Sequence, residues 1–264
     1  MERIELADHD VVGLRADNPG PLTLDGTNSW LVGSGPAWLV DPGPALPAHV
    51  RALAAEAERR GGLGGIALTH DHADHSEAVG ALRERFPEAP LAGARGDVDV
   101  LLGDGDRFGE LEALALPGHA PDHLTFLSGR VGFSGDAVLG RGSVFVAADP
   151  GALTGYLCGL RRLRDRDPAL LCPGHGPLIE DPRAKLDEYL AHRRDRERRL
   201  VEALDAGARG VDQLLDAAWS EVAADLRPVA AITLAAHLDK LSEEGRLPAG
   251  VERPAVAGTL PGSS

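Results

Sequence analysis

The segment from Thr69 to His75 constrains the fold of this chain more than any other. Five of its seven residues are of types that bind metal ions, and four of these, His70, His72, Asp74 and His75, form the pattern His-x-His-x-Asp-His. The segment directly follows the apolar run Gly65–Leu68 and directly precedes an amphipathic stretch, which predicts a turn between a strand and a helix. Side chains at strand ends of α/β sheets converge on an open crevice, so we expect a binding site there.

The spacing within this segment suits two metal ions. In extended backbone, alternation sends His70 and His72 to the same side, while Asp74 and His75, past the turn, can face a nearby point. A metal ion needs nitrogen or oxygen ligands at about 2 Å. One segment can therefore supply part of the ligand set for two ions, and the remaining ligands must come from other strand ends.

Three further strand ends offer such ligands. In each, an apolar run is followed by glycine and then by His or Asp: Gly118-His119, Gly135-Asp136 and Gly174-His175. Glycine lets the backbone turn sharply and approach the site closely. The sequence therefore predicts seven metal ligands, which are His70, His72, Asp74, His75, His119, Asp136 and His175.

In their order, these residues and the earlier Asp41-Pro42-Gly43 resemble the motif set of the metallo-β-lactamase superfamily over about residues 10 to 180. The resemblance implies an α/β fold, an αββα sandwich of two mixed β-sheets flanked by helices. It implies one metal ion on His70, His72 and His119 and the other on Asp74, His75 and His175. Asp136 would bridge both ions, and Asp41 would support the ligands without binding metal.

Other segments resemble the lactamase-beta-2-like branch of that superfamily: Asn18-Pro19-Gly20, Leu24–Gly33, Pro117–His123 and Tyr189–Glu197. Members of this branch carry a C-terminal winged-helix-like domain. The resemblance also places Asn28 and Ser143 beside the cleft. The sequence leaves His123 open between contact with substrate or a supporting carboxylate and an ordinary buried, hydrogen-bonded histidine.

The first two thirds of the chain alternate short apolar runs with amphipathic segments, which indicates a mixed α/β domain. The expected strands are Val11–Arg15, Ser29–Gly33, Ala37–Val40, Gly65–Thr69, Leu91–Ala94, Leu111–Leu116, Leu124–Leu127, Val131–Ser134 and Leu170–Cys172. The expected helices are Pro47–Arg60, Ser76–Phe86 and Ala152–Arg164.

After Pro177 the strand signals nearly vanish. Helices are expected from Asp181-Pro182 to about Ala206, near Val211–Trp219 and over Pro228–Glu244. We therefore expect a catalytic domain over residues 1–180 and a small, helical, winged-helix-like domain over residues 181–264. The run Arg193–Arg199 mixes charges at helical spacing, which favours a solvated face over an RNA contact. His9, His49, His192 and His237 are expected at the surface or hydrogen-bonded.

Composition narrows the setting. A net charge of −14 works against nonspecific tracking along nucleic acid. The start, Met1–Glu5, lacks the apolar core of a secretory signal, and no stretch approaches the ~20 apolar residues of a membrane span. We therefore expect a cytoplasmic protein that does not enter a membrane, with Cys158 and Cys172 as free thiols.

The motifs predict a hydrolase with two Zn²⁺ ions, and Mn²⁺ or Fe would suit the same donors. The expected nucleophile is a metal-bridging hydroxide, with Asp74 and Asp136 as catalytic carboxylates, acting on a small-molecule ester or thioester. Two alternatives stay open, an endoribonuclease-type phosphodiesterase on single-stranded RNA and a non-catalytic nucleic-acid-binding module. Nothing in the sequence bears on the oligomeric state.

Overall fold

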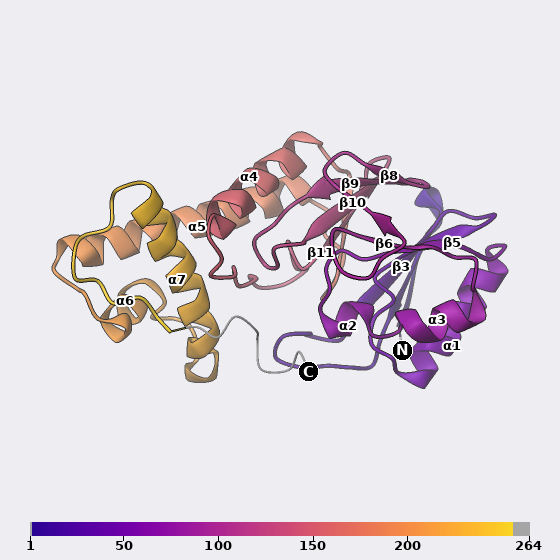
Figure 1. Cartoon of the computed structure of the whole chain (residues 1–264), viewed down its shortest axis with the longest axis horizontal. Helices are drawn as coiled ribbons and strands as arrows, with labels where there is room; N and C mark the ends of the chain where they lie inside the picture. Colours follow the sequence, from indigo (N-terminus) through magenta and orange to yellow (C-terminus); the bar gives the residue numbers. More distant parts are fainter. Residues whose placement is uncertain (1, 256–264) are drawn as a thin grey trace.

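Two β-sheets pack face to face in the computed structural model, which describes residues 2–255 (Figure 1). The first sheet has the order β1-β2-β3-β4-β5-β6-β7, antiparallel from β1 to β4 and parallel from β4 to β7. Its strands are β1 Glu2–Leu6, β2 Val11–Arg15, β3 Asn28–Val32, β4 Ala37–Val40, β5 Leu63–Ala67, β6 Leu91–Gly93 and β7 Val100–Leu101.

The second sheet has the order β12-β11-β10-β9-β8, and only its β11 and β12 pair in parallel. Its strands are β8 Arg107–Phe108, β9 Leu111–Ala115, β10 Leu124–Ser128, β11 Val131–Gly135 and β12 Leu170–Pro173. The helices are α1 Pro47–Arg59, α2 Ala73–Ser76, α3 Val79–Arg85, α4 Ala152–Asp165, α5 Pro182–Asp205, α6 Val211–Ala218 and α7 Arg227–Glu243, with short 3₁₀ helices at Ala7–His9 and Ala224–Leu226.

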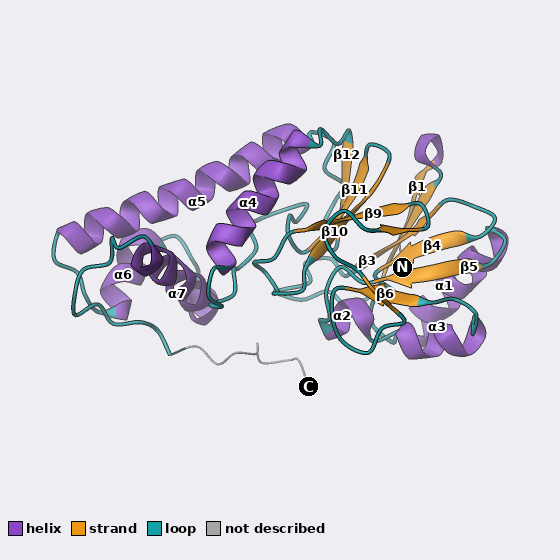
Figure 2. Cartoon of the chain, turned by 45° about the horizontal axis from the view of Figure 1, so that its top comes forward, coloured by secondary structure: helices purple, strands orange, loops and turns teal. Residues whose placement is uncertain are grey.

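Three apolar clusters set the order of the layers. One lies between the sheets, where Trp30 of β3 meets Phe133 of β11. A second packs α1 and α3 on the outer face of the first sheet, with Leu53 and Leu82 fully buried. A third packs α4 and the start of α5 on the second sheet. The result is the predicted αββα sandwich (Figure 2), because these helices bury their apolar sides against the outer faces of the two sheets.

The helical region after β12 forms a fourth cluster that includes Leu200, Leu214, Trp219 and Leu234. The long helix α5 belongs to two clusters, since Leu186 near its start packs beside α4. Residues 174–255 form no strand, so the wing of a winged helix is not observed among them. We propose the division near residue 181 as the domain boundary, with α5 as the element shared by both parts.

The structure differs from the sequence-based expectations mainly at the edges of the two sheets and at the ends of helices. Strands β1, β7 and β8 were not expected, and they are short or largely exposed edge strands. Such strands are held by backbone pairing more than by apolar burial, so they leave little periodic signal. The helix expected over Ser76–Phe86 is divided in the structure into α2, which lies inside the histidine-rich segment, and α3, which begins at Val79. As expected, Cys158 and Cys172 are free thiols.

No helix within residues 2–255 combines the length and apolar character that a bilayer crossing requires.

The fourth cluster predicts how substitutions on α5 behave. Leu200 is fully buried there, so Leu200→Ala should lower the free energy of unfolding by about 2–5 kcal/mol through lost burial and a residual cavity. Arg198→Ala, two residues away on the exposed face, is the matched control and should change stability little. Urea unfolding followed by circular dichroism checks both. A loss below about 1 kcal/mol for Leu200→Ala would contradict this packing.

Candidate metal centre

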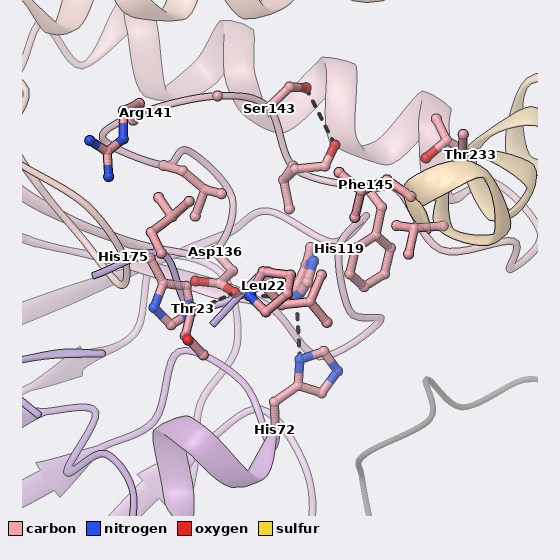
Figure 3. A pocket seen from close by; sticks show the side chains of 18 of the residues that line it. Leu22, Thr23, His72, His119, Asp136, Arg141, Ser143, Phe145, His175 and Thr233 are labelled. Atoms are coloured by element: carbon pink, nitrogen blue, oxygen red, sulfur yellow. Dashed lines mark hydrogen bonds and ion pairs between the residues drawn. The ribbon is translucent and has the colours of Figure 1, made fainter. Parts of the chain in front are cut away.

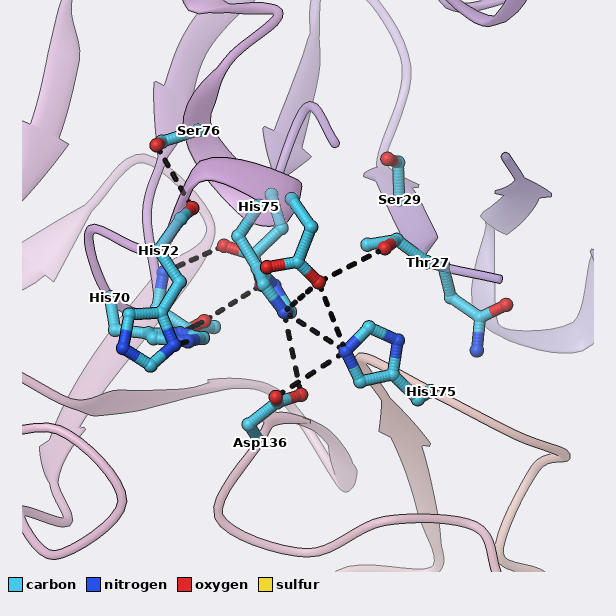
Figure 4. A network of polar contacts seen from close by, with 12 residues as sticks. Thr27, Ser29, His70, His72, His75, Ser76, Asp136 and His175 are labelled. Atoms are coloured by element: carbon cyan, nitrogen blue, oxygen red, sulfur yellow. Dashed lines mark hydrogen bonds and ion pairs between the residues drawn. The ribbon is translucent and has the colours of Figure 1, made fainter. Parts of the chain in front are cut away.

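All seven predicted ligands meet where the carboxyl ends of strands from both sheets come together. Figure 4 shows His70, His72, His75, Asp136 and His175 around this point. The first sheet supplies four of them on the segment after β5, which includes α2, and the second sheet supplies three, each after a different strand. The three are His119 after β9, Asp136 directly after β11 and His175 after β12. The structure thus brings together residues up to about a hundred positions apart, as the spacing predicted.

Three imidazoles form the first group. His72 Nδ1 lies 3.0 Å from His70 Nε2 and 3.1 Å from His119 Nε2. The ligand atoms of the three residues all lie within 4.8 Å of one another. His70 is buried with 1% of its surface exposed, whereas His72 lines an open cleft.

The second group joins two imidazoles and one carboxylate. His75 Nε2 and His175 Nε2 are 3.3 Å apart. Asp74 Oδ2 lies 3.2 Å from the His175 nitrogen and 3.4 Å from the His75 nitrogen. Thr27 Oγ1 donates a 3.3 Å hydrogen bond to the same Asp74 oxygen.

Asp136 lies between the two groups. Its Oδ2 is 3.3 Å from His175 Nε2 and 3.6 Å from His119 Nε2, and its Oδ1 is 3.4 Å from His75 Nε2. One carboxylate therefore faces imidazoles of both groups.

Asp41 fixes the orientation of two of these imidazoles. His75 Nδ1–H donates to Asp41 Oδ2 over 2.9 Å, and the Thr69 hydroxyl donates to the same oxygen over 2.7 Å. Since the Thr69 proton is directed at Asp41, Thr69 Oγ1 accepts from His70 Nδ1–H at 2.9 Å. Both histidines thereby turn an Nε2 lone pair toward the centre, which is how outer partners orient metal-binding histidines.

Glycine is required at two of the ligand-bearing turns. A Cβ at Gly174 would lie 2.6 Å from both Asp136 Oδ1 and His75 Cε1. Gly135 has φ +47°, and a Cβ there would lie 2.5 Å from Thr69 Oγ1. Both positions confirm that the backbone approaches the centre too closely for a side chain.

His123 and Asn28 hold the backbone of the centre and do not line the cleft. His123 Nε2 accepts a 3.1 Å hydrogen bond from the Asp136 backbone N–H. Asn28 donates to the carbonyls of Pro173 and Gly176, which flank His175. Of the two interpretations of His123, the structure favours a buried, hydrogen-bonded histidine. Asn28 was expected either to support the ligands or to contact substrate, and its hydrogen bonds lie on the loop that carries His175.

Burial keeps part of the centre neutral. Burial and the neighbouring His75 hold the pKa of His70 well below its usual value. Burial likewise lowers the pKa of His119 to about 4, against the opposing pull of Asp136. Neutral imidazoles have free lone pairs at neutral pH, which is the form that binds a metal ion.

The carboxylates make the rest of the centre favourable for positive charge. Burial opposes ionisation of Asp136, yet His175 and His75 hold its pKa well below the usual range. Against the effect of burial, Asp136 and Asp74 raise the pKa of His175 to about 9. A metal ion that replaced this proton would meet the same attraction, so metal binding should release protons here.

The centre opens into a cleft of about 710 Å³, a volume typical of small-molecule sites. Figure 3 shows His72, His119, Asp136 and His175 at one end, with Phe145 beside His119. The far wall comes from the helical region. Most of its side chains are apolar, namely Trp219, Val222, Leu226, Val229 and Ala230.

Sequence reasoning missed part of this wall. His192, Arg193 and Arg196 of α5 line the cleft, and both arginines are buried. The expectation of a solvated face is therefore wrong for these residues, although it holds for the exposed Arg198. Ser143 lines the cleft as expected. His237 is buried, and neither of its ring nitrogens has a hydrogen-bond partner among residues 2–255.

Comparison with known proteins shows what this architecture resembles. A family model described as the metallo-beta-lactamase superfamily matches residues 22–101 and 91–175. A beta-lactamase-like protein 2 homolog of Caenorhabditis elegans is 33% identical over 222 residues, covering 77% of this chain and 74% of that protein.

Two further matches bear on activity and on the helical region. An atrochrysone carboxyl ACP thioesterase of Aspergillus chevalieri is 38% identical over 209 residues, covering 74% of this chain and 65% of that protein. A crystal structure of a beta-lactamase domain protein from Burkholderia ambifaria superposes with a TM-score of 0.76 and 23% identity, covering 97% of this chain and 94% of that one. This likeness shows that the fold extends through the helical region.

The Asp41 contacts predict its effect on metal affinity. Asp41→Asn keeps the size of the side chain but weakens its hold on His75 and Thr69, so affinity for Zn²⁺ should fall about 10–100-fold. Competition with a chromophoric chelator measures this. Asp25→Asn, at an exposed carboxylate paired with Arg141, is the matched control. Equal affinities for the two variants would show that Asp41 does not orient the ligands.

Proposed function

Because the chain belongs to the metallo-β-lactamase superfamily, we propose that it hydrolyses a thioester or an ester at a centre of two divalent metal ions. The observation that carries the proposal is the seven-residue cluster at one end of a cleft with largely apolar walls. Each ligand group has side chains that line the cleft, so a substrate held there would reach the metal ions.

The residues present fit metal ions. Four nitrogen ligands arranged tetrahedrally at about 2.0–2.1 Å from zinc would lie about 3.3 Å apart. The nitrogen pairs in the two groups are separated by 3.0, 3.1 and 3.3 Å. One ion would be held by His70, His72 and His119, and the other by Asp74, His75 and His175.

Asp136 would contact both ions, because its oxygens lie within 3.6 Å of nitrogens from each group. Five imidazoles and two carboxylates are donors that favour zinc, and Mn²⁺ or Fe suits the same set. We propose Zn²⁺ as the resident metal.

When bound, the ions supply the Lewis acidity that lets water act as a nucleophile near neutral pH and that polarises a carbonyl group. The residues of the chain then have separate tasks. The Asp74 side chain is 30% exposed, against 10% for Asp136, so Asp74 is the carboxylate better placed to accept a hydrogen bond from the attacking water. Asp136 holds the two ligand groups together.

The cleft favours an acyl substrate over RNA. Its walls include Leu22, Phe145 and Val229, which suit the apolar part of an acyl group. Arg141 near its mouth is paired with Asp25, and the net charge is −14, so the phosphates of a polynucleotide would find few free cations. The similar protein named as an acyl carrier thioesterase supports the same choice.

A parallel assay tests this function. Zinc-loaded protein is given acyl-pantetheine thioesters, p-nitrophenyl esters, bis(p-nitrophenyl) phosphate and single-stranded RNA. We expect cleavage of a thioester or ester. Asp136→Ala should reduce kcat/KM by more than about 100-fold, because removing a proposed metal ligand should cost more activity than the roughly 10–100-fold loss that is typical for removing a residue that only orients a ligand.

Asp71→Ala is the matched control, since Asp71 belongs to the same segment but has an exposed side chain and lies outside the ligand groups. Two results would contradict the proposal. One is metal-loaded protein that cleaves no thioester or ester, and the other is RNA cleavage that Asp136→Ala removes while acyl substrates are left intact.

A further inference from the structure

Arg193 is a buried cation that has no anionic partner in the described part of the chain. It lies on α5, has 2% of its surface exposed and lines the cleft. Its Nη2 donates to Ser143 Oγ over 3.0 Å and to the Val144 carbonyl, both of which are uncharged. Its Nε has no hydrogen-bond partner, and no carboxylate of residues 2–255 forms an ion pair with it. A buried charge without a counter-ion is costly.

The neighbouring arginine shows the contrast. Arg196, one turn along the same helix, donates to the Ala218 carbonyl and pairs with Glu221. The other carboxylates of this stretch of α5 are also engaged, Glu197 by Lys240 and Asp195 by Arg198. Within this cluster Arg196 is neutralised and braces α6, whereas Arg193 keeps a full positive charge at the cleft wall.

A short loop joins Arg193 to the metal centre. Arg193 holds Val144, and the next residue, Phe145, packs on His119 with ring centroids 4.4 Å apart (Figure 3). Arg193 and His119 line the same cleft, so a substrate held in this cleft could contact both. Phe145, together with Val229 and Ala230 of α7, gives this cleft apolar wall surface.

We propose that Arg193 binds an anionic group of the substrate, a carboxylate or a phosphate, while the scissile ester or thioester lies at the metal centre. This inference rests on the proposed function and names the substrate class: an acyl compound with an apolar segment between the reacting carbonyl and an anion. A guanidinium binds both carboxylate and phosphate through its N–H donors. Among residues 2–255 the Nη1 group of Arg193 has no hydrogen-bond partner, so its N–H donors are the ones left for such an anion.

The two sources of the anion can be separated by matched thioesters. Hexanoyl-pantetheine carries no charge, adipoyl-pantetheine carries a carboxylate on the acyl part, and hexanoyl-4′-phosphopantetheine carries a phosphate on the thiol part. With the zinc-loaded wild type we expect at least one anionic thioester to exceed the neutral one in kcat/KM by about tenfold or more, the size of one charge-assisted hydrogen bond.

The variants assign this preference to Arg193. Arg193→Gln should bring the anionic and neutral thioesters within about threefold of each other, and Arg193→Lys should keep part of the preference because it keeps the charge. Arg194→Gln, whose guanidinium lies outside the cleft, should keep the wild-type preference. If Arg193→Gln does not fold, Arg193→Lys tests the assignment instead. If Arg193 only supported the local structure, this substitution would change kcat/KM for all three thioesters by the same factor.

Binding without turnover separates this inference from the proposed function. Calorimetry compares the binding of adipate with that of adipamide, and of 4′-phosphopantetheine with that of pantetheine. It measures anion recognition even if the protein hydrolyses none of the thioesters. We expect at least one anion of these pairs to bind about tenfold more tightly to wild type than to Arg193→Gln. Equal binding of charged and uncharged members, or wild-type kinetics without an anion preference, would overturn the assignment of Arg193.

Discussion

The centre depends on the Asp41 carboxylate, which determines which nitrogen of two histidines faces inward. Asp41 accepts from His75 and from Thr69, and Thr69 in turn accepts from His70. Because the Nδ1–H group of each of these histidines donates a hydrogen bond away from the centre, the Nε2 lone pair of each faces the centre. The turn after β5 carries four of the seven clustered residues, so this small network orients one histidine in each of the two groups.

A second constraint is the balance of charge. The centre has buried imidazoles and two carboxylates, and the carboxylates raise the pKa of His175 to about 9 while burial lowers that of His119 to about 4. Without cations some imidazoles must be protonated to offset Asp74 and Asp136. The same cleft is also lined by Arg193, a buried cation that forms no ion pair with any carboxylate of residues 2–255.

The sequence predicted the centre better than its surroundings, for physical reasons. Metal ligands need particular side chains at strand ends, so His119 or Asp136 could be recognised from an apolar run and a glycine. Strand β1 gave little signal because edge strands rely on backbone pairing. Arg193 was misjudged because a mixed-charge run does not reveal which side of a helix faces a neighbour, and that side became visible only once α5 was placed against the 143–146 loop.

The central claim is that the seven side chains hold two metal ions, and elemental analysis of the purified protein tests it most directly. After dialysis against excess Zn²⁺ and removal of unbound metal, the account predicts two zinc ions per chain, and about one fewer when His175 is replaced by alanine. A wild-type protein that retains no transition metal under these conditions would contradict the account.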